Sequence, residues 1–209
     1  MKSILILAGP SAVGKTTVME KILSLDDKFE YIRSATTRAP RGDGRDSEYI
    51  YLTKDEFLSL VKNARMLEYT EFGGNFYGTP ASEIERIRSA GKNPLLILDI
   101  EGVSSLKSSS YAEDVTAVYL WDEISVLEAR LLERMSLSGA SESAQKIFES
   151  RKAANIKDYR RIKDLGCLFD VFVRNIEVEA SAKKIISAFR YENGKADITE
   201  FSDYLNRLL

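Results

Sequence analysis

One short segment near the start of the chain restricts its fold more than any other part of the sequence. Residues 9–16 read Gly-Pro-Ser-Ala-Val-Gly-Lys-Thr and match the pattern G-x-x-x-x-G-K-[ST]. An apolar run at residues 4–8 precedes them, and residues 17–23 continue with a helical pattern. A strand, a glycine-rich loop and a helix in this order form a phosphate-binding loop, in which backbone N–H groups and the helix N-terminus face an anion. The sequence therefore predicts a site for a nucleoside polyphosphate.

The residues of this loop have different expected tasks. Lys15 should reach the β- and γ-phosphates of the nucleotide, and the Thr16 hydroxyl should ligate Mg²⁺. Asp99 ends the apolar run 95–98 and is the second candidate for the metal site, where it would act through a water molecule. The alternative for Asp99 is a residue that merely ends a strand. The residues expected to contact the nucleotide phosphates are Gly9, Pro10, Ser11, Ala12, Val13, Gly14, Lys15, Thr16 and Thr17.

Apolar runs without alternation recur along the chain and indicate the fold class. They lie at residues 4–8, 95–98, 115–120 and 171–173, and polar or glycine-rich sequence bounds each of them. Such runs fit strands that are covered on both faces, and helical patterns separate them. We therefore expect an α/β fold, with a P-loop NTPase-type parallel sheet flanked by helices. Helices are expected at residues 16–25, 55–62, 82–90 and 181–189, and a turn region at residues 104–110.

The composition limits the chemistry that the chain can use. Its 209 residues include no histidine and one cysteine, and the formal net charge is −2. Imidazole catalysis, metal sites built from His or clustered Cys, and an intrachain disulfide are therefore excluded. Carboxylates, Lys, Arg, hydroxyls, backbone amides and a metal with oxygen ligands remain. The charge gives no support to nucleic-acid binding, and no apolar run has membrane length, so we expect a cytoplasmic protein.

Two polar stretches interrupt the alternation of strands and helices. Residues 34–78 are rich in Arg and Tyr, and residues 123–162 are a heavily charged helical region, so we expect both to be insertions on one α/β core. In the first stretch, Arg38 and Arg41 flank a proline and form a rigid pair of planar groups suited to a phosphate dianion. Ordinary solvated loop charges are the alternative. Further candidate donors are the hydroxyls of Tyr49 and Tyr77.

The second stretch also carries paired arginines. Arg130 and Arg134 lie four residues apart and therefore on one face of the expected helix. Like charges at this spacing repel each other mildly, which favours an anionic partner. Salt bridges to Glu128 and Glu133 are the competing interpretation.

Taken together, these motifs resemble the guanylate kinase family, whose members transfer a phosphoryl group from ATP to GMP. The resemblance rests on the phosphate-binding loop, S-x-T-T-R-x-P-R at residues 34–41, Glu68-Tyr69, and F-G-G-N-F-Y-G-T at residues 72–79, and it extends to about Phe189. It implies ATP as donor, Mg²⁺ as cofactor, and GMP or dGMP as acceptor. By this resemblance Arg38, Arg41, Tyr49 and Tyr77 bind the GMP phosphate, and Ser34, Glu68 and Thr79 bind the guanine.

The family also implies roles for residues after the central strand and in the lid. Asp99 matches the first acidic residue that follows this strand in the family, and Glu101 stands in place of the second one in a link that is two residues shorter than the family's; both join the expected GMP-binding set. Family members close an arginine-bearing lid over ATP. Arg130 and Arg134 match the first part of that lid motif, and Arg151 matches the arginine after it. The expected catalytic residues are Lys15, Arg38, Arg130, Arg134 and Arg151.

The chemistry of the bases agrees with a role for Glu68. Guanine presents N1–H and N2–H₂ as adjacent donors, and one ionised carboxylate can accept from both. Adenine presents a lone pair at N1 instead, so it would leave the carboxylate unpaired and repelled. A single glutamate can therefore select guanine.

We expect a single guanylate-kinase-like domain that acts on nucleotides as a monomer or homodimer. Two other functions remain open: a non-catalytic scaffold domain that binds proteins through the same cleft, and a kinase for another phosphorylated acceptor. The intact Lys15 and Thr16 argue against the scaffold, and Glu68 and Thr79 against the other kinase. Near the end of the chain, Asp197-x-x-Glu200 resembles a capping box that begins an amphipathic helix, packed on the core or on a second subunit. The expected bounds within 1–209 are a core of 1–33, 91–123 and 160–190, a GMP-binding insertion of 34–90, a lid of 124–159 and a C-terminal helical extension of 191–209.

Overall fold

A five-stranded parallel sheet forms the centre of the computed structural model, which describes residues 2–40, 49–137, 142–191 and 198–208. Its strands are, in spatial order, β2 (Phe29–Tyr31), β7 (Asn93–Ile97), β1 (Ile4–Ala8), β8 (Val115–Trp121) and β9 (Val171–Arg174). Every residue of β1 and β8 is buried, as expected for strands covered on both faces. The four strands predicted from apolar runs are therefore present, and the α/β class is confirmed.

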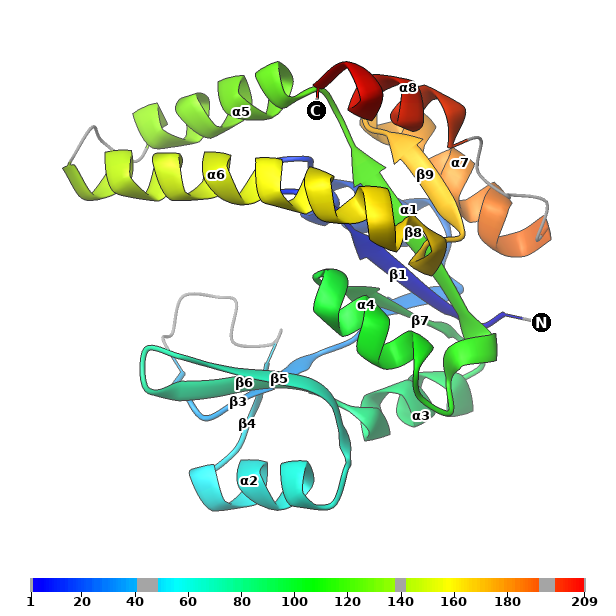
Figure 1. The fold of residues 1–209 in the computed structure, drawn as a ribbon. Coiled ribbons are helices and arrows are strands. Elements are labelled where there is room, and N and C mark those ends of the chain that lie inside the picture. Colours follow the sequence, from blue (N-terminus) through cyan, green and yellow to red (C-terminus); the bar gives the residue numbers. More distant parts are fainter. Residues whose placement is uncertain (1, 41–48, 138–141, 192–197, 209) are drawn as a thin grey trace.

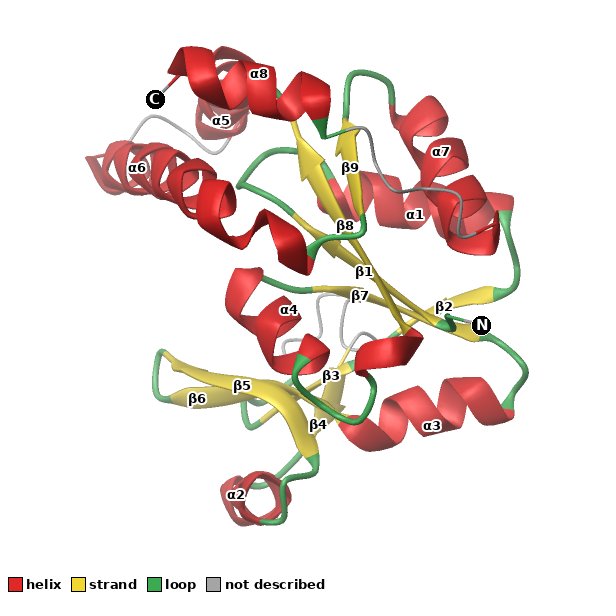
Figure 2. Ribbon diagram, turned by 45° about the vertical axis from the view of Figure 1, so that its right-hand side comes forward, coloured by secondary structure: helices red, strands yellow, loops and turns green. Residues whose placement is uncertain are grey.

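Helices cover both faces of this sheet. α1 (Lys15–Leu25) and α7 (Val178–Tyr191) pack against each other on one face, and α4 (Ile100–Lys107) lies on the other (Figure 2). α3 (Ala81–Ser89) contacts β7, and the short 3-10 helix η2 (Ala112–Asp114) leads into β8. The phosphate-binding loop joins the carboxyl end of central strand β1 to α1. It therefore lies where open α/β sheets bind their ligands.

The predicted turn region at residues 104–110 is wrong in its first part, because α4 continues to Lys107. Asp99 caps this helix, and its Oδ1 accepts a hydrogen bond from the Gly102 N–H at 2.7 Å. The serines of this segment are typical of a turn, but one face of the helix that they belong to is buried. The buried apolar side chains on this face are Ile100, Val103 and Leu106.

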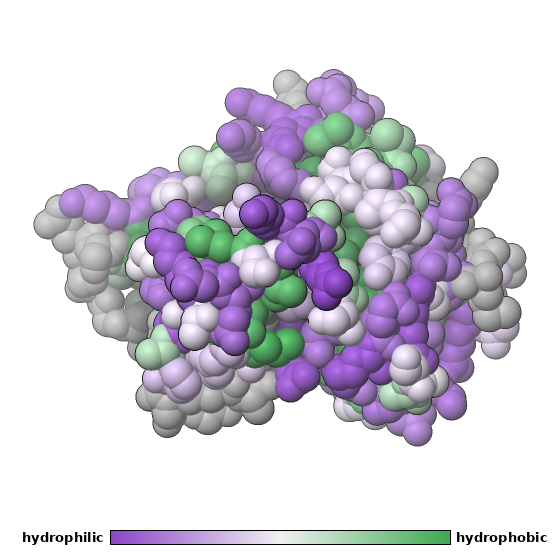
Figure 3. Space-filling model, turned by 90° about the horizontal axis from the view of Figure 1, so that it is seen from below, coloured by the Kyte–Doolittle hydropathy of each residue, from purple (hydrophilic) through white to green (hydrophobic). Residues whose placement is uncertain are grey.

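A second, smaller sheet lies below the first in Figure 1. Its order is β4 (Tyr49–Tyr51), β3 (Ser34–Thr36), β6 (Asn75–Pro80) and β5 (Met66–Phe72), and α2 (Lys54–Lys62) packs against β5 and β6. Gly73 and Gly74 have φ values of 59° and 77°, which allow the tight turn between the two antiparallel strands β5 and β6. Seen from below, this side of the molecule is mostly hydrophilic, with hydrophobic residues in a narrow strip (Figure 3).

Two antiparallel helices form an arm above the second sheet (Figure 1). They are α5 (Ile124–Leu137) and α6 (Glu142–Leu165), and the 3-10 helix η3 (Gly166–Leu168) follows α6. Leu127 and Leu131 of α5 are buried. A small apolar cluster joins Leu131 to Phe148 of α6 and to Ala12 of the phosphate-binding loop. The arm is therefore packed onto the loop at its base.

The last helix, α8 (Thr199–Leu208), packs on the core, which confirms the first of the two expectations for this segment. Phe201 and Leu205 are buried, and Asp197 of the expected capping box lies outside the described residues. None of the helices in the described part of the chain is both long and apolar enough to cross a membrane. The rings around Phe201 are those of Tyr119, Trp121, Tyr159 and Phe172.

Candidate active site

The backbone of the phosphate-binding loop takes conformations that favour glycine. Gly9 has a φ of 145°, and a Cβ there would lie 2.2 Å from the carbonyl oxygen of Leu120. Gly14 precedes α1 with a φ of 96°, and a Cβ there would lie 2.6 Å from the side-chain nitrogen of Asn175. Ala12 also has a positive φ, of 66°, and its methyl group joins the apolar cluster at the base of the arm. The loop therefore curls tightly against β8 and the residue after β9.

Lys15 lies across the loop. Its Nζ donates to the carbonyl oxygens of Gly9 at 2.7 Å and Pro10 at 2.9 Å. Burial lowers the pKa of Lys15 to about 8; Asp158 opposes this shift, and the charge of Arg134 adds to it. The ammonium is thus poorly solvated, and no ion pair to it is formed by the described residues, so an incoming phosphate would stabilise its charge.

Buried asparagines fix the loop from two directions. Asn155 of α6 accepts from the Ser11 N–H at 2.7 Å and donates to the Ser11 carbonyl oxygen at 3.1 Å. Asn175 follows β9 and donates to the Val13 carbonyl oxygen at 2.7 Å. Its Oδ1 is buried and has no hydrogen-bond partner among the described residues. The sequence analysis missed both residues, although Asn175 lies only two residues after the apolar run 171–173.

Arg130 also reaches the loop, and it carries an ion pair that the sequence did not predict. Its guanidinium group lies 3.1 Å from the buried carboxylate of Asp122 and donates to the carbonyl oxygens of Asn175 at 3.2 Å and Val13 at 3.5 Å. The ion-pair partner of Arg130 is thus Asp122, not Glu128 or Glu133 as in the competing interpretation. Glu128 pairs instead with Lys152 at 3.2 Å.

The other two lid arginines lie farther along the arm. Arg134 and Arg151 line a cavity of about 210 Å³ between α5 and α6, together with Leu131 and Phe148. Both arginines are exposed, and the charge of Arg134 acts on Lys15. The structure therefore brings two of the expected catalytic arginines together at one cavity of the arm.

The second sheet places the expected guanine-binding residues opposite each other. Glu68 on β5 faces Thr79 on β6, and the Thr79 hydroxyl donates to the Glu68 carboxylate at 2.7 Å. Burial raises the pKa of Glu68, the Thr79 hydrogen bond opposes this shift, and the charge of Asp99 adds to it. The Thr79 hydroxyl thus orients the Glu68 carboxylate, and the negative charge of Asp99, at the edge of the central sheet, acts on it. Ser34 lies on β3 of the same sheet.

Part of the expected phosphate-binding group also comes together here. The Arg38 guanidinium lies 5.4 Å from the ring centre of Tyr49 and 5.9 Å from that of Tyr51, and it donates to the Ala39 carbonyl oxygen at 3.0 Å. Tyr77 lies opposite Thr36 on the neighbouring strand β3. Arg41 lies outside the described residues.

The acidic residues near the loop have separate surroundings. Asp99 is exposed at the start of α4, and Glu101 forms an ion pair at 2.6 Å with Arg161 of α6, with its side chain 63% exposed. Asp158 of α6, which the sequence analysis missed, lies within the electrostatic reach of Lys15, and burial raises its pKa. Thr16 is exposed in the first turn of α1.

A glycine-rich loop between a central parallel strand and a helix, closed from above by an arginine-bearing arm, defines a P-loop nucleotide-binding protein. A family model described as guanylate kinase matches residues 1–192. The guanylate kinase of Lactococcus lactis is 34% identical over 193 residues, covering 90% of this chain and 88% of that protein. The guanylate kinase of Bacillus subtilis is 32% identical over 184 residues, covering 87% and 85%.

Solved structures agree with this assignment. A crystal structure of guanylate kinase from Anaplasma phagocytophilum superposes with a TM-score of 0.63 at 25% sequence identity, covering 92% of this chain and 87% of that one. The chain belongs to the guanylate kinase family, and it is an enzyme of the nucleoside monophosphate kinase class.

Proposed function

We propose that the protein transfers the γ-phosphoryl group of ATP to GMP or dGMP, giving ADP and GDP or dGDP. The observation that carries this proposal is the Glu68–Thr79 pair, a base-selective group on the second sheet within reach of the charge of Asp99 beside the phosphate-binding loop. A nucleotide bound at each place would bring the two phosphate tails together between the sheets.

On the donor side, residues 9–17 would hold the ATP phosphates. The loop is already shaped by its glycines and by Asn155 and Asn175, so little rearrangement is needed when the anion binds. Lys15 would exchange its hydrogen bonds to two carbonyl oxygens for bonds to phosphate oxygens, and its charge would stabilise the phosphoryl group during transfer.

On the acceptor side, the ionised Glu68 would accept from guanine N1–H and N2–H₂. Thr79 and Ser34 would add hydroxyl contacts to the base. Arg38, with Arg41, Tyr49 and Tyr77, would bind the GMP phosphate, and Asp99 and Glu101 complete the proposed GMP-binding set. The stacking of Arg38 on two tyrosine rings supports this role, because it holds a planar donor at the edge of the sheet.

The donor atoms beside the loop fit a magnesium ion. The Thr16 hydroxyl is a hard oxygen ligand, the type that Mg²⁺ prefers, and the second carboxylate oxygen of Asp99 would hold the ion through a water molecule. In the described part of the chain, no three His, Cys, Asp or Glu residues are grouped so that they could hold a metal by themselves. This suits an ion that takes most of its ligands from nucleotide phosphates and water. When bound, Mg²⁺ supplies charge neutralisation at the phosphates.

The reaction needs no strong base. An oxygen of the GMP phosphate attacks the γ-phosphorus of ATP, a new P–O bond forms, and the bond to the β-phosphate bridging oxygen breaks, so that ADP leaves. Lys15, Arg38 and the lid arginines Arg130, Arg134 and Arg151 would stabilise the charge on the transferred group. The arm formed by α5 and α6 would exclude water that could otherwise hydrolyse ATP.

We also propose the division of the chain that the sequence suggests. The core comprises 1–33, 91–123 and 160–190, the GMP-binding insertion 34–90, the lid 124–159 and the C-terminal extension 191–209. The partners are ATP and GMP or dGMP, with no nucleic acid or membrane, and the protein acts in the cytoplasm as a monomer or homodimer.

A coupled assay of ADP release tests the proposed function. ATP and Mg²⁺ are combined with GMP, dGMP, AMP, UMP or CMP, and turnover with GMP is expected to exceed that with AMP by at least about 10³-fold, because AMP leaves Glu68 unpaired. Turnover led by AMP or UMP would contradict the base selection. Absence of turnover with every acceptor would favour a scaffold that binds proteins.

A further inference from the structure

The segment that joins the central sheet to the arm, residues 121–124, is held by contacts from α6, from α8 and from Arg174. We call this segment the lid root. It contains the end of β8 and the first residue of α5. Tyr159 of α6 donates to the Asp122 carbonyl oxygen at 2.5 Å and accepts from the Asp122 N–H at 3.2 Å. The other contacts to the lid root come from α8 and Arg174.

Tyr204 of α8 makes the most direct contact. Its hydroxyl accepts from the Ile124 N–H at 2.7 Å. The first N–H groups of a helix have no partner within the helix, so this bond caps α5 from a segment about 80 residues away. The ring of Tyr204 also stacks on Trp121, with centroids 5.6 Å apart. Tyr204 therefore fixes both ends of the lid root.

Arg174 joins α8 to the same segment through its charge. Its guanidinium group lies 2.6 Å from Glu123, 3.4 Å from Asp122 and 3.2 Å from Glu200 of α8. It also lies over the Trp121 ring, 5.3 Å from the centroid. Glu200 thus holds the arginine that binds two carboxylates of the lid root.

The lid root leads directly to the phosphate-binding loop. The carboxylate of Asp122 is 2% exposed and holds Arg130, which donates to the Val13 carbonyl oxygen. Asn175 donates its N–H to the Trp121 carbonyl oxygen at 2.9 Å and its side-chain N–H to Val13. A shift of the lid root would therefore displace Arg130 and the loop together.

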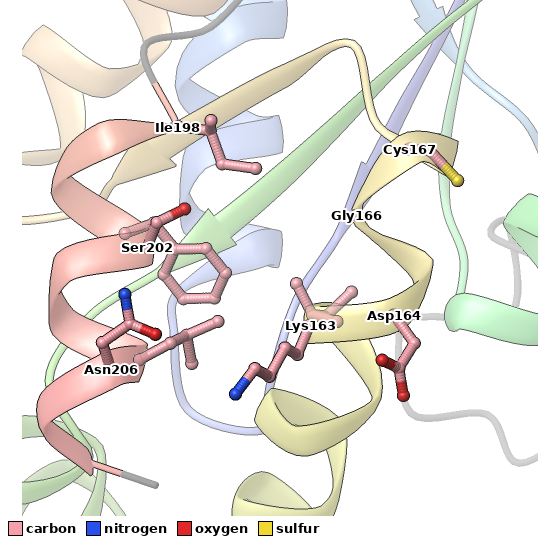
Figure 4. A pocket seen from close by; sticks show the side chains of 10 residues that line it. Lys163, Asp164, Gly166, Cys167, Ile198, Ser202 and Asn206 are labelled. Carbon is pink, nitrogen blue, oxygen red and sulfur yellow. The ribbon is translucent and has the colours of Figure 1, made fainter.

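We propose that α8 is a positioning element for catalysis, in which Tyr204 and Glu200 hold the lid root so that Arg130 stays in register with the phosphate-binding loop. This inference rests on the proposed phosphoryl transfer. α8 lies beyond residue 192, where the match to the family model ends. The opposite edge of α8 is less tightly packed: Ser202 and Asn206 lie across a pocket of about 280 Å³ from Lys163 (Figure 4).

Tyr204→Phe tests the proposal because it removes one hydroxyl and keeps the packed ring. We expect kcat to fall about five-fold, from the loss of one hydrogen bond, while KM for GMP stays within two-fold. Tyr191→Phe is the matched control, since Tyr191 is exposed at the end of α7, and its kcat should equal that of the wild type. An unchanged kcat in Tyr204→Phe would overturn the proposal.

Glu200→Gln is the second variant. Its side chain is 61% exposed, so the substitution should not affect folding. We expect a fall in kcat of about two- to three-fold, because Arg174 keeps its other two carboxylates. If both variants lose thermal stability while kcat is retained, α8 stabilises the fold only and the proposal fails.

A double-mutant cycle between Tyr204→Phe and Arg130→Lys separates positioning from general damage. If Tyr204 acts through Arg130, the fall in kcat caused by Tyr204→Phe should shrink to less than two-fold in the Arg130→Lys background. Independent, multiplying effects would overturn the proposal. A wild-type protein without turnover on GMP would refute the proposed function itself, whereas an active wild type with unaffected variants would refute only this inference.

Discussion

The two nucleotide sites of this molecule are built differently. The phosphate-binding loop lies against the central sheet, and buried side chains from α6 and from the residue after β9 bond to its backbone. Of the expected acceptor residues, Arg38 and Glu68 lie on or beside the smaller sheet, and their described side-chain contacts stay within that sheet and the residues around it. Asp99 and Glu101 of the same proposed set lie at α4 of the core. The loop is fixed by the core, whereas the side-chain contacts of the acceptor sheet are largely self-contained.

This difference has a functional consequence. A loop fixed by distant elements can meet a triphosphate without reorganising, which favours electrostatic catalysis. A self-contained acceptor sheet can move toward the loop when its own nucleotide binds, in the manner of domain closure around ligands. Substitutions on one side should therefore alter the binding of one nucleotide and spare the other.

The largest expected effect comes from removing the loop cation. Lys15→Met should lower kcat by about 10³-fold, because the charge on the transferred group loses a buried partner. GMP binding, measured by calorimetry, should stay within two-fold of the wild type. Lys21→Met is the matched control, since Lys21 pairs with Glu179 on the far side of α1. Loss of GMP binding in Lys15→Met would mean that the two sites are not separate.

Glu68→Gln should impair the use of GMP and leave the binding of ATP unchanged. The amide offers one acceptor where the carboxylate offers two, so kcat/KM for GMP should fall about 10²-fold while KM for ATP is unchanged. Glu71→Gln, on the same strand and exposed, should behave as the wild type. Steady-state kinetics with each substrate varied in turn checks this. Equal losses for both nucleotides would contradict a self-contained acceptor site.

The pH dependence of kcat/KM for ATP tests the environment of Lys15 in the ATP site. Burial lowers the pKa of Lys15 to about 8, and the protonated form carries the charge that ATP needs. Because kcat/KM reports the ionisation of the free enzyme, kcat/KM for ATP should fall as the pH rises through about 8, about ten-fold per unit above it. Lys15→Arg should lose this alkaline decline in its residual activity. A flat profile up to pH 10 would contradict the assigned environment of Lys15.

Asn155→Ala tests how far the core fixes the loop. It removes both hydrogen bonds to Ser11, so KM for ATP should rise about five-fold with KM for GMP unchanged. Asn63→Ala is the control, because Asn63 caps the C-terminal end of α2 and its side-chain hydrogen bonds in the described structure go to Ser59. A rise in KM for GMP instead would show that Asn155 serves the other site.

The sequence predicted those parts of the fold that are determined by a short, continuous stretch of residues. β1 and β8 are buried on both faces, so their apolar runs are visible in the sequence, and the loop motif fixes its neighbours in order. The strands of the second sheet are partly exposed and carry polar residues, so no apolar run marks β3, β5 or β6. α4 was missed in part because serines occupy its exposed face.

The site, like the fold, could be predicted where a short motif defines it and not where distant residues meet. The phosphate-binding-loop motif named Lys15, and the resemblance to the family named Glu68; the surroundings of both suit their expected tasks. The residues that hold the loop and the lid root make contacts across more than 30 residues, which no spacing rule reveals. The competing interpretation for Arg130, salt bridges along its own helix, missed the ion pair with Asp122 for this reason: it considered only neighbours on that helix, whereas Asp122 directly follows β8.

A crystal structure with GMP and a non-hydrolysable ATP analogue bound together tests the central claim most directly. The account predicts that the triphosphate lies on residues 9–17, the GMP phosphate on Arg38, and the guanine edge on the carboxylate of Glu68. A guanine base bound away from Glu68 and Thr79, or a GMP phosphate remote from Arg38, would contradict it.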